Sequence, residues 1–295
     1  MKKYVIVFGC ATLALTSLSW AAQSRVQVSK IRSNKTVVIP ERAVQVADNV
    51  FSLGTAFDSQ SGKMVEGYAI IRYAKGGKPS AAKDKTSSCY GFLARGAKWK
   101  VDPILEPWVV NPSNTPIGKD EKPNPQLDKD EVFRLLSEGI DKWEDATDGI
   151  VDNSKGEDVL GTGSITTDIL VADTVSPDEK NEVYFADIAS PNAIGVTIVW
   201  GIFGGPPSGR ELVEWDQIYD DYDFDWSLST DENGELGKMD FDSIATHELG
   251  HSMGMGDLYN SVCSEQTMFG YASTGETNKR TLESGDIAGI SKLYK

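Results

Sequence analysis

The apolar positions of the chain fall into segments with different periods. Between residues 128 and 146 they recur at helical spacing, which places them on one face of a helix. The residues of that face are Val132, Leu136, Ile140 and Trp143. Asp128 and Glu131 stand at the start of the pattern with the spacing of a capping box, so we predict a helix over 128–146.

Short apolar runs predict strands on both sides of this helix. Residues 99–110 form an extended apolar run ahead of it. The runs that follow it cover residues 182–185, 194–201 and 212–219. Helical spacing returns at 241–253 and at about 285–294. These elements predict a domain of mixed α and β structure.

The first 88 residues have a different character. Residues 46–75 predict a small β unit with a turn-rich centre, and residues 75–88 are rich in Gly, Pro, Lys and Ser, which is typical of a linker. Residues 22–45 are polar and have no clear period. We therefore predict a leader or prosegment at 22–88, followed by a domain at 89–295.

The N-terminus has the pattern of a secretory signal. Two lysines precede an apolar run over residues 4–18, and small residues follow at Ser19 and Ala21. The run is shorter than the roughly 20 residues of a membrane-spanning helix, which argues against a membrane anchor. We expect a signal peptide at 1–21 and a secreted protein, extracellular or periplasmic, without a membrane span.

The composition of the chain limits the classes of function and the kinds of site that are possible. The 295 residues carry a formal net charge of −15, which argues against binding nucleic acid through a basic face. The chain has only two histidines, so any site that needs three imidazoles is excluded. Metal binding or acid–base chemistry through imidazole therefore depends on His247 and His251.

These two histidines surround a glutamate in the pattern H-E-x-x-H. Positions four apart on a helix lie on one face, so both rings can present a nitrogen to one ion at ~2.0–2.1 Å. Glu248 is rotated away from the ion and reaches the water bound to it. A helix with two hydrogen-bonded histidines and a surface acid is the alternative interpretation.

A third ligand must come from outside this helix, because catalytic zinc usually has three protein ligands and an open position for water. Gly254 stands where the helix is expected to end, and glycine adopts the left-handed conformation that turns a chain back. Asp257 follows three residues later and can meet the ion from another direction. A solvated acid in a turn is the alternative for Asp257.

The segment from His247 to Asp257 resembles the elongated zinc motif of the metzincins, with Asp in place of the usual third histidine. Residues 267–271 resemble the Met-turn, and residues 282–294 resemble the closing helix of the matrixins. The resemblance covers about residues 89–295. It implies an α+β, zincin-like fold with a twisted, mostly parallel sheet, an active-site helix, a Met-turn and a C-terminal helix, preceded by the small β-rich N-terminal segment.

The resemblance implies roles for residues near the zinc. Met268 is the methionine expected beneath the metal; a buried core methionine is the plain alternative. Tyr271 follows it by three residues, whereas the zinc-contacting tyrosine of some metzincins follows by two. Tyr271 is therefore expected to contact the zinc, to line the specificity pocket or to pack nearby.

Cys89 and Cys263 remain after removal of the signal, and a disulfide between them is the interpretation that we favour. Two free thiols are one alternative. The other is a cysteine switch like that of matrixin proforms, in which Cys89 caps the zinc. The residues around Cys89 lack the sequence pattern of that switch.

The acidic run at 216–225 contains carboxylates of the kind that calcium prefers. A complete calcium-loop pattern is absent, so a solvated acidic loop is the interpretation that we favour. One catalytic Zn²⁺ is the predicted cofactor, and Ca²⁺ stays an alternative.

We predict a secreted, monomeric zinc endopeptidase that acts on proteins or peptides, with Glu248 as general base. Residues 194–201 resemble the matrixin edge strand that pairs with an extended substrate. A non-catalytic, metal-stabilised binding or structural protein on the same fold is the alternative, and the presence of Glu248 argues against it. A zincin site with a distant ligand such as Glu276 is a third interpretation, which Gly254 and Asp257 disfavour.

Overall fold

The structure is a computed structural model, and its described residues are 36–76, 88–100, 107–114, 127–151 and 153–295. The chain divides into two units, residues 1–36 and Val37–Lys295. The predicted signal peptide and the first part of the predicted leader lie outside the described residues. None of the helices formed by the described residues is long and apolar enough to cross a membrane.

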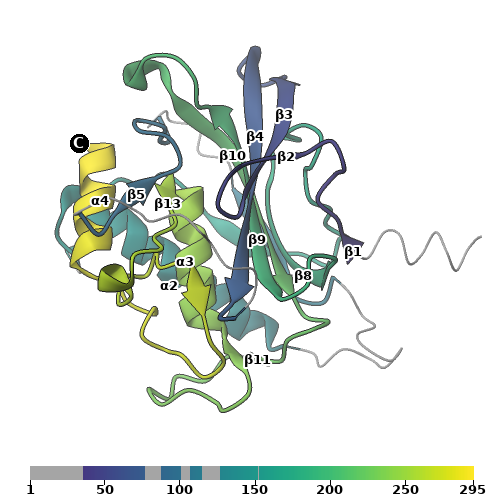
Figure 1. The fold of residues 1–295 in the computed structure, drawn as a ribbon, viewed down its shortest axis with the longest axis vertical. Coiled ribbons are helices and arrows are strands. Elements are labelled where there is room, and N and C mark those ends of the chain that lie inside the picture. Colours follow the sequence, from purple (N-terminus) through teal and green to yellow (C-terminus); the bar gives the residue numbers. More distant parts are fainter. Residues whose placement is uncertain (1–35, 77–87, 101–106, 115–126, 152) are drawn as a thin grey trace, which may run out of the picture. The chain divides into compact units, whose positions relative to one another are not determined.

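Within the described residues, ten strands form one mixed sheet. In chain order they are β1 Thr36–Val37, β2 Val44–Ala47, β3 Val50–Asp58, β4 Lys63–Ala74, β6 Trp108–Asn111, β7 Gly163–Ile165, β8 Asn181–Ile188, β9 Ala193–Ile202, β10 Glu211–Asp220 and β14 Tyr271–Ala272. Their order across the sheet is β2-β3-β4-β9-β10-β8-β6-β7, with β1 beside β8 and β14 beside β4 (Figure 1).

The sheet has a parallel half and an antiparallel half. β10, β8, β6 and β7 run parallel to one another, as expected for a zincin-like fold. β9 runs antiparallel to β10, and β4, β3 and β2 continue in antiparallel order. Two short pairs lie outside this sheet in the described part of the chain: β5 Gly91–Phe92 with β13 Met255–Gly256, and β11 Trp226–Ser227 with β12 Met239–Asp240.

The α-helices of the described residues lie on one side of the sheet (Figure 1). They are α2 Lys129–Asp145, α3 Phe241–Ser252 and α4 Ser284–Tyr294, and short 3-10 helices occupy η2 Ala146–Asp148, η3 Pro207–Gly209 and η4 Ser261–Cys263. Asp128 caps α2, as its position predicts, by accepting from two backbone N–H groups of the first turn. α2 is fixed to α3 because Nε1 of Trp143 donates to the carbonyl of Thr246 at 2.7 Å.

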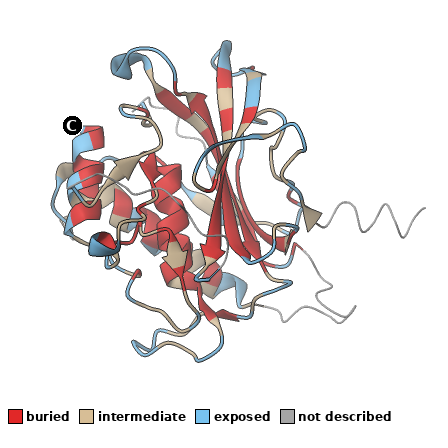
Figure 2. Cartoon of the chain, viewed as in Figure 1, coloured by how far each residue is buried: buried red, intermediate tan, exposed pale blue. Residues whose placement is uncertain are grey.

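Apolar side chains form a core on each face of the sheet. On the helix side, aromatic rings pack against one another, among them Phe185, Tyr219, Trp226 and Phe241. The opposite face carries a second cluster, which includes Ile71 and Trp200 and packs against Val37, Ile39 and Ala172. Figure 2 shows that burial is concentrated in the central strands and in α3.

The elements predicted at 128–146, 241–253 and 285–294 correspond to α2, α3 and α4, and the later predicted strands correspond to β8, β9 and β10. The predicted β unit at 46–75 also forms, as β3 and β4, but it is not a separate layer. β4 pairs with β9 from Glu66–Gly201 to Tyr73–Ala193, so it belongs to the central sheet. The division at residue 88 into a leader and a catalytic domain stays a prediction.

Candidate metal centre and active site

α3 carries three predicted site residues into the interior. The helix begins at a capping carboxylate, since Asp240 accepts from a backbone N–H of the first turn. His247, Glu248 and His251 are all fully buried. Beyond the helix the chain reverses at Gly254, which has φ +96° and where a Cβ would lie 2.6 Å from a backbone oxygen. Glycine is therefore required at the point where the sequence predicts the turn.

Backbone carbonyls lie at the Nδ1 atoms of both histidine rings and fix the orientation of the rings. Nδ1 of His247 lies 2.7 Å from the carbonyl oxygen of Thr267, and Nδ1 of His251 lies 3.0 Å from that of Met255. Because a carbonyl only accepts, each neutral ring donates through Nδ1 and keeps a lone pair on Nε2. Both Nε2 atoms are buried and have no hydrogen-bond partner among the described residues.

Asp257 completes a cluster of three ligand atoms. Its Oδ1 lies 3.1 Å from Nε2 of His247 and 3.6 Å from Nε2 of His251, and it too is buried without a hydrogen-bond partner in the described part of the chain. Two atoms bound tetrahedrally to zinc at ~2.05 Å lie about 3.3 Å apart. Three converging lone pairs repel one another unless a cation lies among them, so this donor set fits a zinc ion.

Tyr259 holds the other oxygen of Asp257. Its hydroxyl donates to Oδ2 at 2.8 Å and accepts from the side-chain amide of Asn49 at 2.8 Å. These bonds leave Oδ1 directed at the histidines. Neither residue was predicted, because a tyrosine in a loop and an asparagine in a distant turn carry no motif.

Burial and neighbouring charges set the protonation states. Burial lowers the pKa of His247 to about 3, and the positive charge of Arg72 adds to this effect. Burial alone would raise the pKa of Asp257, but the two histidines and the Tyr259 hydroxyl lower it to about 2. A neutral imidazole and a charged carboxylate are the forms that bind a metal ion.

Glu248 lies beside β9. The hydroxyl of Thr197 donates to its Oε2 at 2.5 Å, whereas its Oε1 is buried without a hydrogen-bond partner among the described residues. Burial raises the pKa of Glu248, and the electrostatic interactions with His251 and Arg72 and the bond from Thr197 partly offset this. Thr197 was not predicted as a site residue; its only signal is a hydroxyl within the otherwise apolar run at 194–201.

Met268 lies beneath the active-site helix. It is fully buried, and a Cβ at Gly250 would lie 2.3 Å from its sulfur. Asp286 of α4 accepts from the backbone N–H of Thr267 at 2.8 Å and of Met268 at 3.2 Å. α4 thereby fixes the turn whose carbonyl orients His247.

Two other predicted candidates lie around this turn. Tyr271 lies in β14, and its ring centroid is 5.5 Å from that of Tyr259. Its direct role at the zinc stays a prediction. Glu276, the alternative third ligand, accepts from the N–H of Ser273 at 2.9 Å and from Lys279, and it is not part of the ligand cluster.

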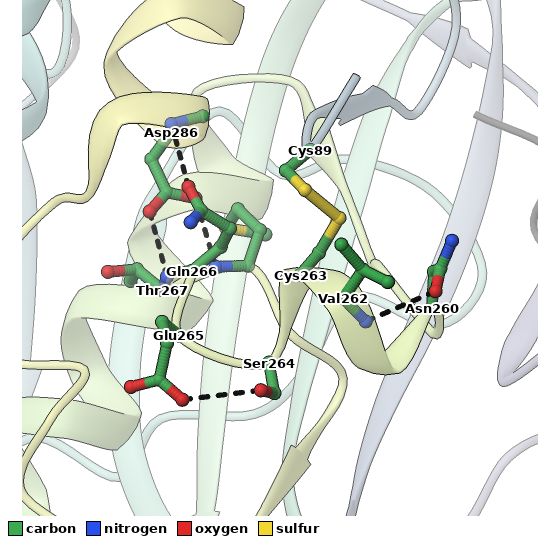
Figure 3. Close-up of a disulfide and its surroundings, with 11 residues drawn as sticks. Cys89, Asn260, Val262, Cys263, Ser264, Glu265, Gln266, Thr267 and Asp286 are labelled. Atoms are coloured by element: carbon green, nitrogen blue, oxygen red, sulfur yellow. Dashed lines mark hydrogen bonds between the residues drawn. A yellow bond between two sulfur atoms is a disulfide. The ribbon is translucent and has the colours of Figure 1, made fainter. Parts of the chain in front are cut away.

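Cys89 and Cys263 form a disulfide across 174 positions (Figure 3). Cys263 ends η4, in the loop between Asp257 and Met268, and Cys89 precedes β5, which pairs with β13. The bridge therefore ties the start of the predicted catalytic domain to the loop beside the metal centre. Of the three interpretations offered for these cysteines, the structure contains the disulfide.

A second acidic group lies at β10. One carboxylate oxygen from each of Asp173, Glu214 and Asp216 lies within 4.8 Å of the others, and atoms of Asp173 and Glu214 are buried without hydrogen-bond partners among the described residues. Burial raises the pKa of Asp173 to about 6 and of Glu214 to about 10, and it raises that of Asp216 well above its usual range. Asp216 is the one residue of the run 216–225 in this group, and both Asp216 and Asp220 accept from backbone N–H groups.

Comparisons with known proteins identify relatives of the chain. The profile of the matrixin family matches residues 114–295, which is more than half of the chain. Metalloendoproteinase 5-MMP of Arabidopsis thaliana is 28% identical over 173 residues, which are 56% of this chain and 40% of the relative. Metalloendoproteinase 2-MMP of the same plant is 34% identical over 92 residues, which are 30% and 21% of the two chains. The chain thus spans less than half the length of either relative, and no solved structure matches it.

Proposed function

The chain belongs to the matrixin family, and on this premise we propose that it is a zinc-dependent endopeptidase that hydrolyses peptide bonds in proteins. One observation carries the proposal. Three lone-pair atoms, from His247, His251 and Asp257, converge beside a buried glutamate whose Oε1 has no partner among the described residues. A non-catalytic metal site has no need of that glutamate.

Each residue has a defined part in this reaction. His247, His251 and Asp257 would hold the zinc ion, which when bound supplies a Lewis acid that activates water and polarises the scissile carbonyl. Glu248 takes the proton of the attacking water on Oε1 and passes it to the leaving amine. Thr197 is a positioning residue, because its bond to Oε2 orients the carboxylate so that Oε1 carries the proton.

Asp257 gives the metal site a negative charge that a third imidazole would not. The ion should therefore be a weaker Lewis acid than in a site with three histidines. Replacement of Asp257 by His is expected to change both zinc affinity and the pH dependence of hydrolysis. If the Asp257→His protein matches the parent in both, this account of the aspartate is wrong.

Peptide cleavage with and without a chelator tests the proposed activity. Glu248→Gln should retain zinc but lower kcat by about 10²–10⁴-fold, the usual contribution of a general base. Glu276→Gln is the matched control and should keep both zinc and activity. Zinc binding without Glu248-dependent cleavage would favour the alternative of a metal-stabilised binding or structural protein.

The acidic group at β10 supports a calcium ion as a second cofactor. Hard cations prefer several carboxylate oxygens, and a cation there would supply partners for Asp173 and Glu214. Secretion is supported by the signal pattern at 1–21 and by a disulfide, which persists in oxidising compartments. An N-terminus at Ala22 in the exported protein would establish the cleavage site.

A further inference from the structure

Asp257 differs from the two histidines in the number of atoms that it can offer to a metal ion. An imidazole offers one nitrogen, whereas a carboxylate can bind an ion through one oxygen or through both. A second bound oxygen would take the open position that catalytic zinc keeps for water. Residues that hold the other oxygen of Asp257 therefore control the coordination of the ion.

The two oxygens of Asp257 have different surroundings. Oδ1 lies 3.1 Å from Nε2 of His247 and has no hydrogen-bond partner among the described residues. Oδ2 accepts from the hydroxyl of Tyr259 at 2.8 Å. A rotation of the carboxylate that brought Oδ2 to the metal would break this bond, and hydrogen bonds to a charged group are the stronger kind.

Asn49 fixes the direction of the Tyr259 hydroxyl. Its side-chain amide donates to the hydroxyl oxygen at 2.8 Å. An amide N–H can only donate, and a phenol has a single proton, so that proton must point to Oδ2 of Asp257. Asn49 is itself held in place: it is 5% exposed in the turn between β2 and β3, and its carbonyl accepts from the N–H of Ile71 at 2.9 Å.

The ring of Tyr259 cannot follow a rotation of the carboxylate. A Cβ at Gly270 would lie 2.4 Å from this ring, so the ring packs directly on the backbone just after Met268. Leu258 pairs with the same stretch of chain. Its N–H donates to the carbonyl of Met268 at 2.8 Å, and its carbonyl accepts from the N–H of Gly270 at 2.9 Å. The tyrosine is therefore fixed by its backbone, its ring and its hydroxyl.

We propose that Tyr259 is a positioning residue that restricts Asp257 to binding zinc through Oδ1 alone, and that Asn49 orients the tyrosine. Two imidazoles and one carboxylate oxygen leave one corner of a tetrahedron free, so this hydrogen bond preserves the open position for water. The inference rests on the proposed zinc site and deepens it.

The same hydrogen bond should make the site selective among metal ions. Mn²⁺ prefers six oxygen-rich ligands, whereas zinc is satisfied by a tetrahedral set. A second oxygen from Asp257 would therefore favour Mn²⁺ more than zinc. By holding Oδ2 away from the ion, Tyr259 disfavours Mn²⁺ relative to zinc.

Tyr259→Phe tests the proposal, because it removes the hydroxyl and keeps the ring. The full chain is freed of metal with a chelator and loaded with Co²⁺, whose visible absorption is strong at four-coordinate sites and weaker at sites with more ligands. The parent should give the strong absorption of a four-coordinate site. Tyr259→Phe should give the weaker absorption, because Oδ2 of Asp257 joins the ion.

Metal affinity provides a second readout. Loss of a residue that orients a metal ligand typically lowers metal affinity about 10–100-fold, and competition with a fluorescent chelator should show a loss of this size for zinc in Tyr259→Phe. The affinity for Mn²⁺ should fall less, so the ratio of the two affinities should decrease. Tyr68→Phe is the matched control. The Tyr68 hydroxyl also donates to a carboxylate, that of Glu66 at 3.0 Å, and its loss should change neither the absorption nor the ratio.

A double-mutant cycle tests the part of Asn49 without a change at the tyrosine ring. Asn49 has φ 60°, which glycine tolerates, so Asn49→Gly removes the amide and preserves the turn. It should lower zinc affinity severalfold in the parent and have no effect in Tyr259→Phe, because both residues act through one hydroxyl. Asn192→Gly, at an exposed residue with φ 64°, is the control and should leave zinc affinity unchanged. Additive effects of Asn49→Gly and Tyr259→Phe would overturn the part of Asn49.

The outcomes separate this inference from the proposed function. If Tyr259→Phe and the parent have the same Co²⁺ absorption and the same ratio of zinc to Mn²⁺ affinity, the inference is overturned, whether or not the chain cleaves peptides. If both readouts change as expected but the zinc-loaded parent hydrolyses no peptide, the endopeptidase assignment fails and the positioning of Asp257 by Tyr259 stands.

Discussion

Thr197 offers a direct test of how the structure positions the proposed base. Its hydroxyl donates to Oε2 of Glu248 at 2.5 Å, and both residues are fully buried. Valine has nearly the same shape but cannot donate. A hydrogen bond to a charged group contributes about 1.5–3 kcal/mol, and 1.36 kcal/mol corresponds to a tenfold change in a dissociation constant. Thr197→Val should therefore lower the acid dissociation constant of Glu248 by about ten- to a hundredfold.

The sign of the effect follows from the structure. The hydrogen bond from Thr197 lowers the pKa of Glu248, so its loss raises that pKa. A general base works only when it is deprotonated. The acid limb of the pH profile of kcat/KM should therefore move to higher pH by about one to two pH units in Thr197→Val.

The assay uses the full chain with its zinc content measured. Thr197→Ser keeps the hydroxyl and should keep the acid limb near that of the parent. Equal acid limbs in the valine and serine proteins would refute the positioning role. Loss of zinc in the valine protein would show instead that the hydroxyl maintains the whole site.

Three further perturbations test the packing, the cross-link and the acidic group. Gly250→Ala places a Cβ 2.3 Å from the sulfur of Met268; overpacking costs about 1–3 kcal/mol, so Tm and zinc affinity should fall together in calorimetry and zinc titration. The double variant Cys89→Ser/Cys263→Ser removes a cross-link over 174 positions; the chain-entropy model predicts a loss of up to about 5 kcal/mol, and an unchanged urea midpoint would contradict it. In calcium-free buffer, the free energy of unfolding should fall as the pH rises from about 4 toward 10. The pKa of Glu214 is raised to about 10 in the folded state, so the unfolded chain loses this proton at a lower pH than the folded protein does. Added calcium should raise Tm most at high pH, and a Tm that is unaffected by calcium would argue against a cation at this group.

The parts that the sequence predicts well are local. The site residues of α3 stand within one helix, and the period of the helix alone brings His247 and His251 to one face. Gly254 and Asp257 follow the end of the helix by only a few residues. One glycine in the left-handed conformation is enough to reverse the direction of the chain there. The resemblance to the family then predicts the architecture of the sheet. The parallel half of the observed sheet has the order of elements that the resemblance implies.

The parts that the sequence does not predict depend on strand pairing between distant segments. Nothing in the spacing of the run 46–75 says that it joins β9, since pairing depends on fit across the strands, such as Gly67 against the ring of Trp200. Arg72 and Thr197 are single residues in apolar strands, and each becomes notable only when its strand is placed beside Glu248. The segment 22–88 was predicted as a leader with a small β unit, and the pairing of its strands with the central sheet was not predicted.

Arg72 and the zinc ion should oppose each other at the active site. Both are cations that depend on the charge of Asp257, and the positive charge of Arg72 disfavours added positive charge at His247. Coupling between two charges at one site is reciprocal, so the charge of Arg72 weakens zinc binding by the same free energy by which bound zinc destabilises the buried guanidinium. Couplings of this kind are typically 1–3 kcal/mol, which predicts a zinc affinity at least about fivefold higher in Arg72→Ala than in the parent. Competition with a fluorescent chelator measures it, and Arg72→Lys, which keeps the charge, should resemble the parent. Equal zinc affinity in the alanine, lysine and parent proteins would show that the charge of Arg72 does not act on the metal centre.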